Sequence, residues 1–142
     1  MGIQTGSERT KRLYRRNYSN QQVIEAARIM NAFRDRIGAP QYDIIVDNPW
    51  ETHEDLVDTL MFLTELPAPY NLFLLSLTFY PGTELYEKAK KEGKITNDLE
   101  EVYRKDFNNF KPGYYNRLLL LLNESQGKMT KEMIFLLTNG TL

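Results

Sequence analysis

The most informative segment of this sequence is Asp43-Ile44-Ile45-Val46-Asp47-Asn48-Pro49-Trp50-Glu51-Thr52-His53-Glu54-Asp55-Leu56. It predicts a buried strand, a sharp turn and a capped helix. The β-branched run 44–46 favours extended backbone, and Pro49 ends the strand because it disfavours helical backbone at the residue before it. Thr52 caps the next helix, whose first turn is acidic. In parallel α/β folds ligands bind at this end of the strands, so its polar groups are site candidates.

The same unit recurs on both sides of this segment. Residues 2–7 form the end of a strand, and a helix over 20–37 starts at a Ser-x-x-Gln capping box. A second apolar strand covers 71–79, and a helix follows it as far as Gly93. Strands that alternate with helices predict a parallel sheet built from right-handed crossovers.

The pattern changes after residue 95. We expect a helix over 96–104, a loop over 108–113, an apolar helix over 114–123 and a last helix over 130–137 that ends at Gly140. The sequence therefore predicts two parts. Residues 1–95 form the sheet with its helices, and residues 96–142 form a helical tail packed on it.

Side-chain alternation divides each predicted strand into two faces. Asp43, Ile45 and Asp47 share one face of the first strand. In the second strand the face of Phe73, Leu75, Leu77 and Phe79 is wholly apolar and is expected to meet the helices. The other face ends in Ser76, Thr78 and Tyr80, and Gln4 extends it. Polar residues at these strand ends predict a ligand-binding interior. The alternative is that this face is exposed to water, or that its polar groups hydrogen-bond to one another.

Composition limits the class of protein. The chain has 142 residues, 42% hydrophobic and 26% charged, with a net charge of −1, as in an ordinary globular domain. It has no apolar run of about 20 residues and no signal peptide, so we expect a cytoplasmic location and no membrane contact. The basic run 9–16 is the local exception. It fits either an RNA contact or a solvated helix that carries one ligand arginine.

The sequence has no cysteine. Disulfides, thiolate metal sites and a cysteine nucleophile are therefore excluded within these residues. The single histidine, His53, is expected at the surface. Glu51, Glu54 and Asp55 could form a metal cluster, but acids at a helix start more often stabilise the helix dipole.

Three segments in order resemble the second half of the barrel of radical S-adenosylmethionine (SAM) enzymes. Residues 2–8 resemble the fourth-strand ending of that family, residues 43–56 its fifth-strand segment, and Tyr80-Pro81-Gly82-Thr83-Glu84-Leu85-Tyr86 with Glu92-Gly93 its sixth-strand ending and next helix. The residues of these segments are most similar to those of the cobalamin-binding-domain and methylthiotransferase-like branches. The resemblance implies an α/β fold: a parallel-stranded partial (β/α) barrel fragment of roughly three strand–helix units over residues 2–95.

The resemblance also implies ligand contacts. Asp43 would accept hydrogen bonds from the ribose hydroxyls of SAM, and Arg16 would pair with its methionine carboxylate. Gln4 and Ser7 would line the same pocket. Without the resemblance, Asp43 is an ordinary strand-end carboxylate and Arg16 a solvated basic residue.

The turn after the first full strand departs from the family pattern Gly-x-Pro-Gly. Here these positions read Asp47-Asn48-Pro49-Trp50, so side chains enter where the family backbone passes the adenine. Asp47, Pro49 and Trp50 are therefore expected at the cofactor site. Trp50 would either stack on the base or fill the core. The residues expected to line the substrate pocket, for a small molecule or RNA, are Ser76, Thr78 and Tyr80.

A larger departure is the absence of the three-cysteine loop that holds the 4Fe–4S cluster of the family. These residues alone are therefore predicted to be inactive in radical chemistry. We expect a fragment whose parent carries the cluster, with cobalamin left open, and whose partner is the missing N-terminal half of the barrel. Two rivals remain: a cysteine-free binding or assembly module, and a non-radical barrel enzyme that uses Asp43 and Asp47 as acid and base. The edge strand at 2–6 predicts self-association of the isolated chain.

Overall fold

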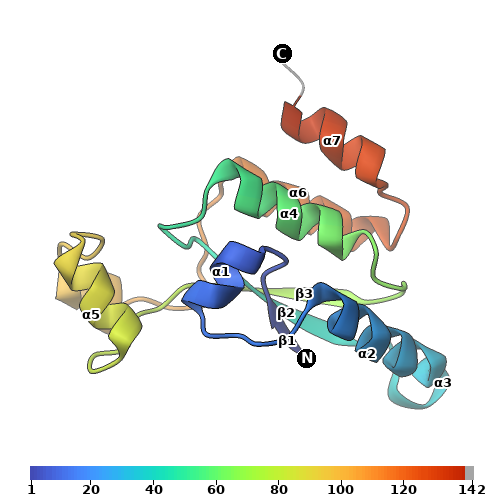
Figure 1. The fold of residues 1–142 in the computed structure, drawn as a ribbon, viewed down its shortest axis with the longest axis horizontal. Helices are drawn as coiled ribbons and strands as arrows, with labels where there is room; N and C mark the ends of the chain where they lie inside the picture. The colour runs from blue at the N-terminus through green and yellow to red at the C-terminus, as the bar shows by residue number, and fades with distance from the viewer. Residues whose placement is uncertain (140–142) are drawn as a thin grey trace.

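The computed structural model describes residues 1–139 as three parallel strands that alternate with helices and lead into a helical tail (Figure 1). The strands pair in the order β1 (Gly2–Gln4), β2 (Gln41–Val46), β3 (Asn71–Ser76). The helices are α1 (Glu8–Leu13), α2 (Asn20–Ala32), α3 (Arg34–Ile37), α4 (His53–Leu63), α5 (Glu84–Lys91), the π-helix η1 (Leu99–Tyr103), α6 (Tyr114–Ser125) and α7 (Lys131–Asn139). The predicted fold class is confirmed, while the predicted helix end at Gly140 lies outside the described residues.

The helix starts follow the predicted capping chemistry. Ser19 and Thr52 each form a complete capping box, with Gln22 and Asp55 as the third helical residues. Thr83 caps α5 by accepting a hydrogen bond from the backbone of Tyr86. Local sequence therefore determines where these three helices begin.

The predicted helix over 20–37 is broken. α2 ends at Ala32, and the short α3 follows after one residue. Phe33 and Ile37, which continue the apolar spacing, are 52% and 60% exposed. The helical period was correct, but the sheet is too short to cover the last turns of the stripe.

The main core lies between the sheet and the helices α4 and α6. Tyr42, Ile44 and Val46 alternate along β2 and are at most 2% exposed on this face. Both helices lie on the same side of the sheet in Figure 1, and α6 contacts α4 and β3. The predicted helix-facing side of β2 is confirmed.

The predicted faces of β3 are reversed. Ile44 pairs with Leu74 and Ile45 with Leu75, so Leu74 lies on the helix side. Leu74 is 6% exposed there, whereas Phe73 on the open side is 41% exposed. Both faces of this strand are apolar over most of its length, so the sequence of β3 alone does not indicate which face is buried. Its pairing with β2 determines the buried face.

Helix α5 does not cover the sheet. It projects beyond the C-terminal ends of the strands together with η1 (Figure 1), and α6 covers β3 instead. The residues of this second core are Leu77, Phe79, Ala89, Ile95 and Val102. The chain after β3 therefore forms a wall at the end of the sheet where a ligand is expected.

Both sheet edges are partly capped. On β3, the Leu72 N–H donates to Asn123 Oδ1 at 2.7 Å and the Ser76 N–H to the Phe107 carbonyl at 2.7 Å. On β1, Tyr18 Oη donates to the Ile3 carbonyl at 2.6 Å. Less edge is free than the sequence indicates, and self-association of the isolated chain stays a prediction. Among residues 1–139, no helix has the length and apolarity to cross a membrane.

We predict that Gly6→Ala lowers the free energy of unfolding by about 2 kcal/mol, because overpacking of this kind costs about 1–3 kcal/mol. A Cβ at Gly6 would lie 2.8 Å from Thr59 Cα and 2.8 Å from Phe62 Cβ on α4. The matched control is Gly113→Ala, whose Cβ meets nothing within 4 Å. Urea denaturation measures both variants. Equal stability of the two would contradict the close approach of the β1 exit to α4.

Candidate functional site

The main cavity, about 570 Å³, lies between α1, the open face of β2 and the start of α5. Its floor is apolar and includes Ile45 and Leu77. Two residues predicted to bind SAM, Gln4 and Arg16, lie in its wall. The charged residues of the wall are Arg12, Arg15, Arg16, Lys88 and Glu84. Four cations against one carboxylate make this cavity suited to an anionic group.

A second cavity of about 290 Å³ adjoins the first, because both are lined by Ile45 and Leu77. It contains all three predicted substrate residues: Ser76, Thr78 and Tyr80. Tyr80 is 61% exposed, whereas Ser76 is 3% exposed. The structure thus brings Thr78 and Tyr80 together beside the cationic cavity, whereas Ser76 pairs with Val46 and its hydroxyl donates to Asp47.

Asp47 is turned away from the open face, contrary to the prediction that it shares a face with Asp43. Its φ is 61°, which breaks the alternation of the strand. Its carboxylate accepts hydrogen bonds from Ser76 Oγ at 2.7 Å, the Lys111 N–H at 3.0 Å and Asn116 Nδ2 at 2.9 Å. Asp47 therefore ties the tail to the ends of β2 and β3.

Asp43 stays on the open face of β2. Gln41 Nε2 donates to its Oδ1 at 3.2 Å. It lies two residues before Ile45, about 7 Å along the strand from the floor of the main cavity. Asp43 is not among the residues that line this cavity, so its contact with a ribose stays a prediction.

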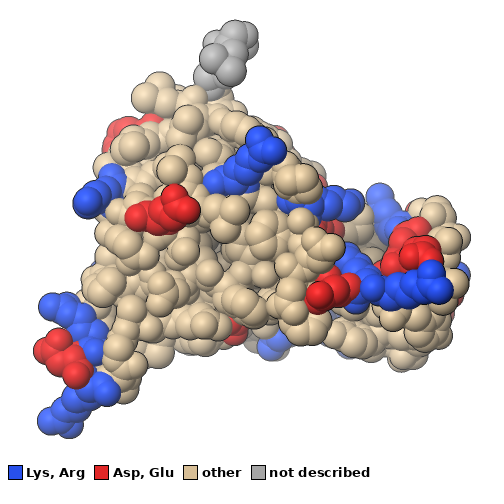
Figure 2. Space-filling view, turned by 180° about the vertical axis from the view of Figure 1, so that it is seen from behind, with Lys and Arg blue, Asp and Glu red and all other residues tan. Residues whose placement is uncertain are grey.

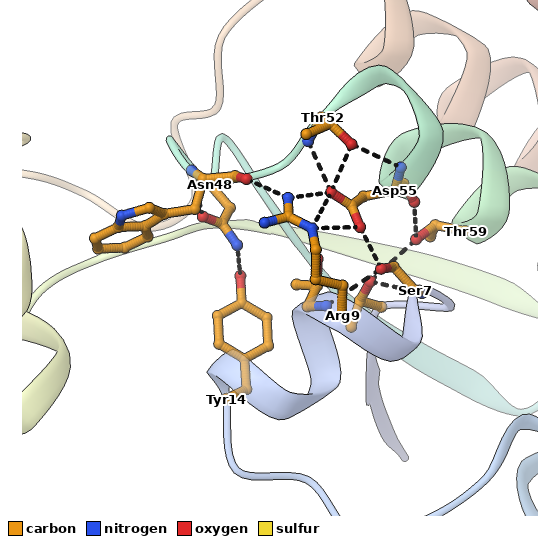
Figure 3. Close-up of polar contacts among 10 residues, drawn as sticks. Ser7, Arg9, Tyr14, Asn48, Thr52, Asp55 and Thr59 are labelled. Carbon is orange, nitrogen blue, oxygen red and sulfur yellow. Dashed lines mark hydrogen bonds and ion pairs between the residues drawn. The ribbon is translucent and has the colours of Figure 1, made fainter.

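Ser7 is not in the cavity wall. It caps α1 and donates to Asp55 Oδ1 at 2.5 Å (Figure 3). The same carboxylate accepts from Arg9 Nε at 3.0 Å, from the Thr52 N–H at 2.8 Å and from Thr52 Oγ1 at 2.9 Å. This Asp55 network joins the β1 exit and α1 to the start of α4. The sequence signal for it is Thr52-x-x-Asp55, in which Thr52 is predicted to cap the helix and Asp55 only to stabilise the helix dipole.

Burial opposes ionisation of Asp55, but hydrogen bonds from Arg9, Ser7 and Thr52 outweigh it and hold its pKa well below the usual range. Glu51 shows the opposite shift. Burial, and next the charge of Asp55, raise its pKa to about 7, while Arg9 and nearby threonine hydroxyls oppose the shift. Two carboxyl groups in the same turn thus titrate far apart because only one receives a full set of donors.

Trp50 packs in the second core. Its ring lies edge-on to Phe79, with centroids 5.9 Å apart, and its Nε1 donates to Glu92 Oε2 at 2.6 Å. Lys88 Nζ lies 5.6 Å from the ring centroid. Trp50 lines a smaller cavity of about 370 Å³ rather than the main one. The position of Trp50 thus agrees with the alternative that it fills the core. The expected contacts of Pro49 and Trp50 with adenine stay predictions.

The structure bears on two alternative uses of charged residues. Lys11, in the basic run, is 1% exposed and donates to Glu8 Oε1 at 2.8 Å, so it is not free to contact an RNA phosphate. The described part of the chain also has no group of three His, Cys, Asp or Glu able to hold a metal ion. Glu54 and Asp55 lie in the first turn of α4, and Glu51 precedes its cap, Thr52.

We predict that Asp55→Asn lowers the free energy of unfolding at pH 7 by about 2 kcal/mol, since hydrogen bonds to charged groups contribute about 1.5–3 kcal/mol. The folded pKa lies below the unfolded one, so this stability is present above about pH 4 and disappears as pH falls further. Denaturation at pH 3 and pH 7 measures it, with Asp35→Asn on α3 as control. A difference that does not shrink at pH 3 would contradict the charge-based explanation.

Glu51→Gln should raise the free energy of unfolding at neutral pH, whereas Asp55→Asn lowers it. Because the folded pKa is raised from 4.5 to about 7, the wild-type carboxyl loses stability as pH rises through that interval. We expect the variant to gain on the order of 2 kcal/mol relative to wild type between pH 4.5 and pH 8, less than the full shift because the group is partly accessible. Thermal denaturation against pH measures this, with Glu25→Gln as control. A constant difference across pH would refute the raised pKa.

No protein-family model matches the chain. It is 28% identical over 135 residues to the tRNA-2-methylthio-N(6)-dimethylallyladenosine synthase of Saccharopolyspora erythraea, which covers 94% of this chain and 24% of that protein. It is also 28% identical over 129 residues to the threonylcarbamoyladenosine tRNA methylthiotransferase of Aquifex aeolicus, which covers 85% of this chain and 31% of that one. The chain spans about a quarter to a third of these relatives. At low identity, this similarity to radical SAM methylthiotransferases supports the superfamily resemblance.

Proposed function

We propose that the chain is part of a radical SAM enzyme of the tRNA methylthiotransferase type and forms one wall of its SAM and substrate pockets. A single observation carries the proposal. Arg16 and Gln4, which the family resemblance assigns to SAM, lie together in the wall of the cationic cavity beyond the C-terminal ends of the parallel strands. The relatives support the same assignment at the level of the superfamily.

The residues of this cavity fit the chemistry of SAM. Its volume of about 570 Å³ is that of a small-molecule site. The Arg16 guanidinium is a planar donor matched to a carboxylate, and the floor of Ile45 and Leu77 is apolar enough to take an adenosine. Asp43 would face the ribose from the open side of β2. In this proposal these side chains bind and orient SAM and keep water from it.

The adjoining cavity is proposed to hold the group that reacts. Thr78 and Tyr80 line it beside Ile45, next to the cationic wall. Both relatives are named as tRNA-modifying enzymes, so a nucleoside of tRNA is the proposed substrate of the parent protein. The exposed residues Arg12 and Arg15 offer positive charge to a phosphate at the rim of the main cavity.

The residues of this chain do not fit the 4Fe–4S cluster, because none is a cysteine. When bound, that cluster supplies the electron for radical chemistry in the family, and in this proposal it belongs to the remaining part of the barrel. We also propose that the remaining part of the barrel is the partner of this chain and that the parent protein is cytoplasmic. The rival acid–base enzyme loses support, because Asp47 is committed to three structural hydrogen bonds and is turned away from the face of Asp43.

We predict that the 142-residue chain binds SAM and that Arg16→Ala weakens this binding about tenfold or more. A hydrogen bond to a charged group contributes about 1.5–3 kcal/mol, which corresponds to about 10- to 100-fold in affinity. Isothermal titration calorimetry of the wild type and the variant measures it. Arg36→Ala on α3, which is exposed and far along the chain from the cavity wall, should leave the affinity unchanged. Absence of binding by the wild type, or equal affinity of Arg16→Ala, would refute the proposal.

A further inference from the structure

The segment that carries Arg16 has an unusual backbone. Arg15 follows α1 with a φ of 55°, in the left-handed region that helix ends usually fill with glycine. The Arg15 N–H donates to the Arg12 carbonyl at 3.1 Å, and the Arg16 N–H donates to the Lys11 carbonyl at 2.9 Å. A side chain at such a position costs stability, and strain of this kind is concentrated at functional sites.

Two side-chain contacts hold this turn in place. Arg15 pairs with Glu84 at the start of α5, but both side chains are about three-quarters exposed, so solvent screens the pair. The other contact is partly buried: Asn48 Nδ2 donates to Tyr14 Oη at 2.9 Å (Figure 3). The Tyr14 contact is therefore the stronger anchor of the turn.

Asn48 is itself fixed. It is 7% exposed, and its Oδ1 accepts a hydrogen bond from the Trp50 N–H at 3.0 Å. The Tyr14 ring packs against the second core. Burial raises the pKa of Tyr14 well above its usual range, so its hydroxyl stays neutral at working pH. The anchor thus links the end of α1 to the turn after β2.

We propose that Tyr14 is a positioning residue for the SAM carboxylate. Its hydrogen bond with Asn48 holds the left-handed turn at Arg15, and that turn directs Arg16 into the main cavity. The inference rests on the proposed function for its ligand, but its geometric part concerns this chain alone. Tyr14 also lines the main cavity, but its hydroxyl is engaged by Asn48, and in this proposal both residues act on the SAM carboxylate through Arg16.

The test compares two ligands and two tyrosines. Tyr14→Phe keeps the ring and removes the hydroxyl. We expect SAM to bind the variant about fivefold more weakly, as expected for one hydrogen bond, while 5′-methylthioadenosine, the same nucleoside without the carboxylate, binds equally well. In the double variant with Arg16→Ala, Tyr14→Phe should cause no further loss. Tyr18→Phe, which loses a hydroxyl bonded to the Ile3 carbonyl, should show no preference between the ligands.

A second readout needs no ligand. The {¹H}–¹⁵N heteronuclear NOE of the Arg16 amide should fall in Tyr14→Phe and stay unchanged in Tyr18→Phe. Wild-type affinity for SAM in Tyr14→Phe, equal losses for both ligands, or an unchanged Arg16 amide would overturn the proposal. Failure of the wild type to bind either ligand would refute the proposed function instead, and the NOE would still decide the positioning role.

Discussion

The buried carboxylate of Asp55 is the interaction on which the candidate site depends. It accepts hydrogen bonds from Ser7, Arg9 and Thr52 and so joins the β1 exit and α1 to the start of α4. Removing one partner from a buried charge leaves it without compensation, so such a network holds its members in one arrangement. Gly6 allows the two segments to approach closely enough for the network to form.

The position of α1 follows from this network, and the cationic cavity follows from the position of α1. The helix ends beside the open face of β2. Arg12 in its last turn, with Arg15 and Arg16 just after it, supplies most of the positive charge of the cavity wall. Asp47 fastens the tail at the other side of the strand ends. The carboxylates Asp47 and Asp55 are thus used for structure, while Arg12 and Arg16 are left facing the cavity. A site built in this way attracts anions and not cations. Seen from behind the view of Figure 1, uncharged residues make up most of the middle of the surface (Figure 2).

Local patterns predicted the elements well, because capping boxes, proline breaks and β-branched runs act over a few residues. Gln4 and Arg16, which the resemblance assigns to one site, line one cavity, and Thr78 and Tyr80, which strand alternation assigns to one face, line the adjoining one. The local patterns gave wrong predictions where contacts between distant segments determine the structure. The register of β3 with β2 determines which face of β3 is exposed. The positive φ of Asp47 determines where its side chain points, and the neighbouring residues in the sequence do not predict that φ. The sequence predicts Asp55 as a helix-start acid, but two of its partners, Ser7 and Arg9, lie more than 40 positions away.

The most direct test of the account is a crystal structure of the chain with SAM bound. The account predicts the methionine carboxylate at the Arg16 guanidinium, with the adenosine along Gln4, Ile45 and Leu77 and the ribose towards Asp43. Ligand density at another place, such as the smaller cavity beside Trp50, would contradict it. So would a ligand in the main cavity with its carboxylate directed away from Arg16.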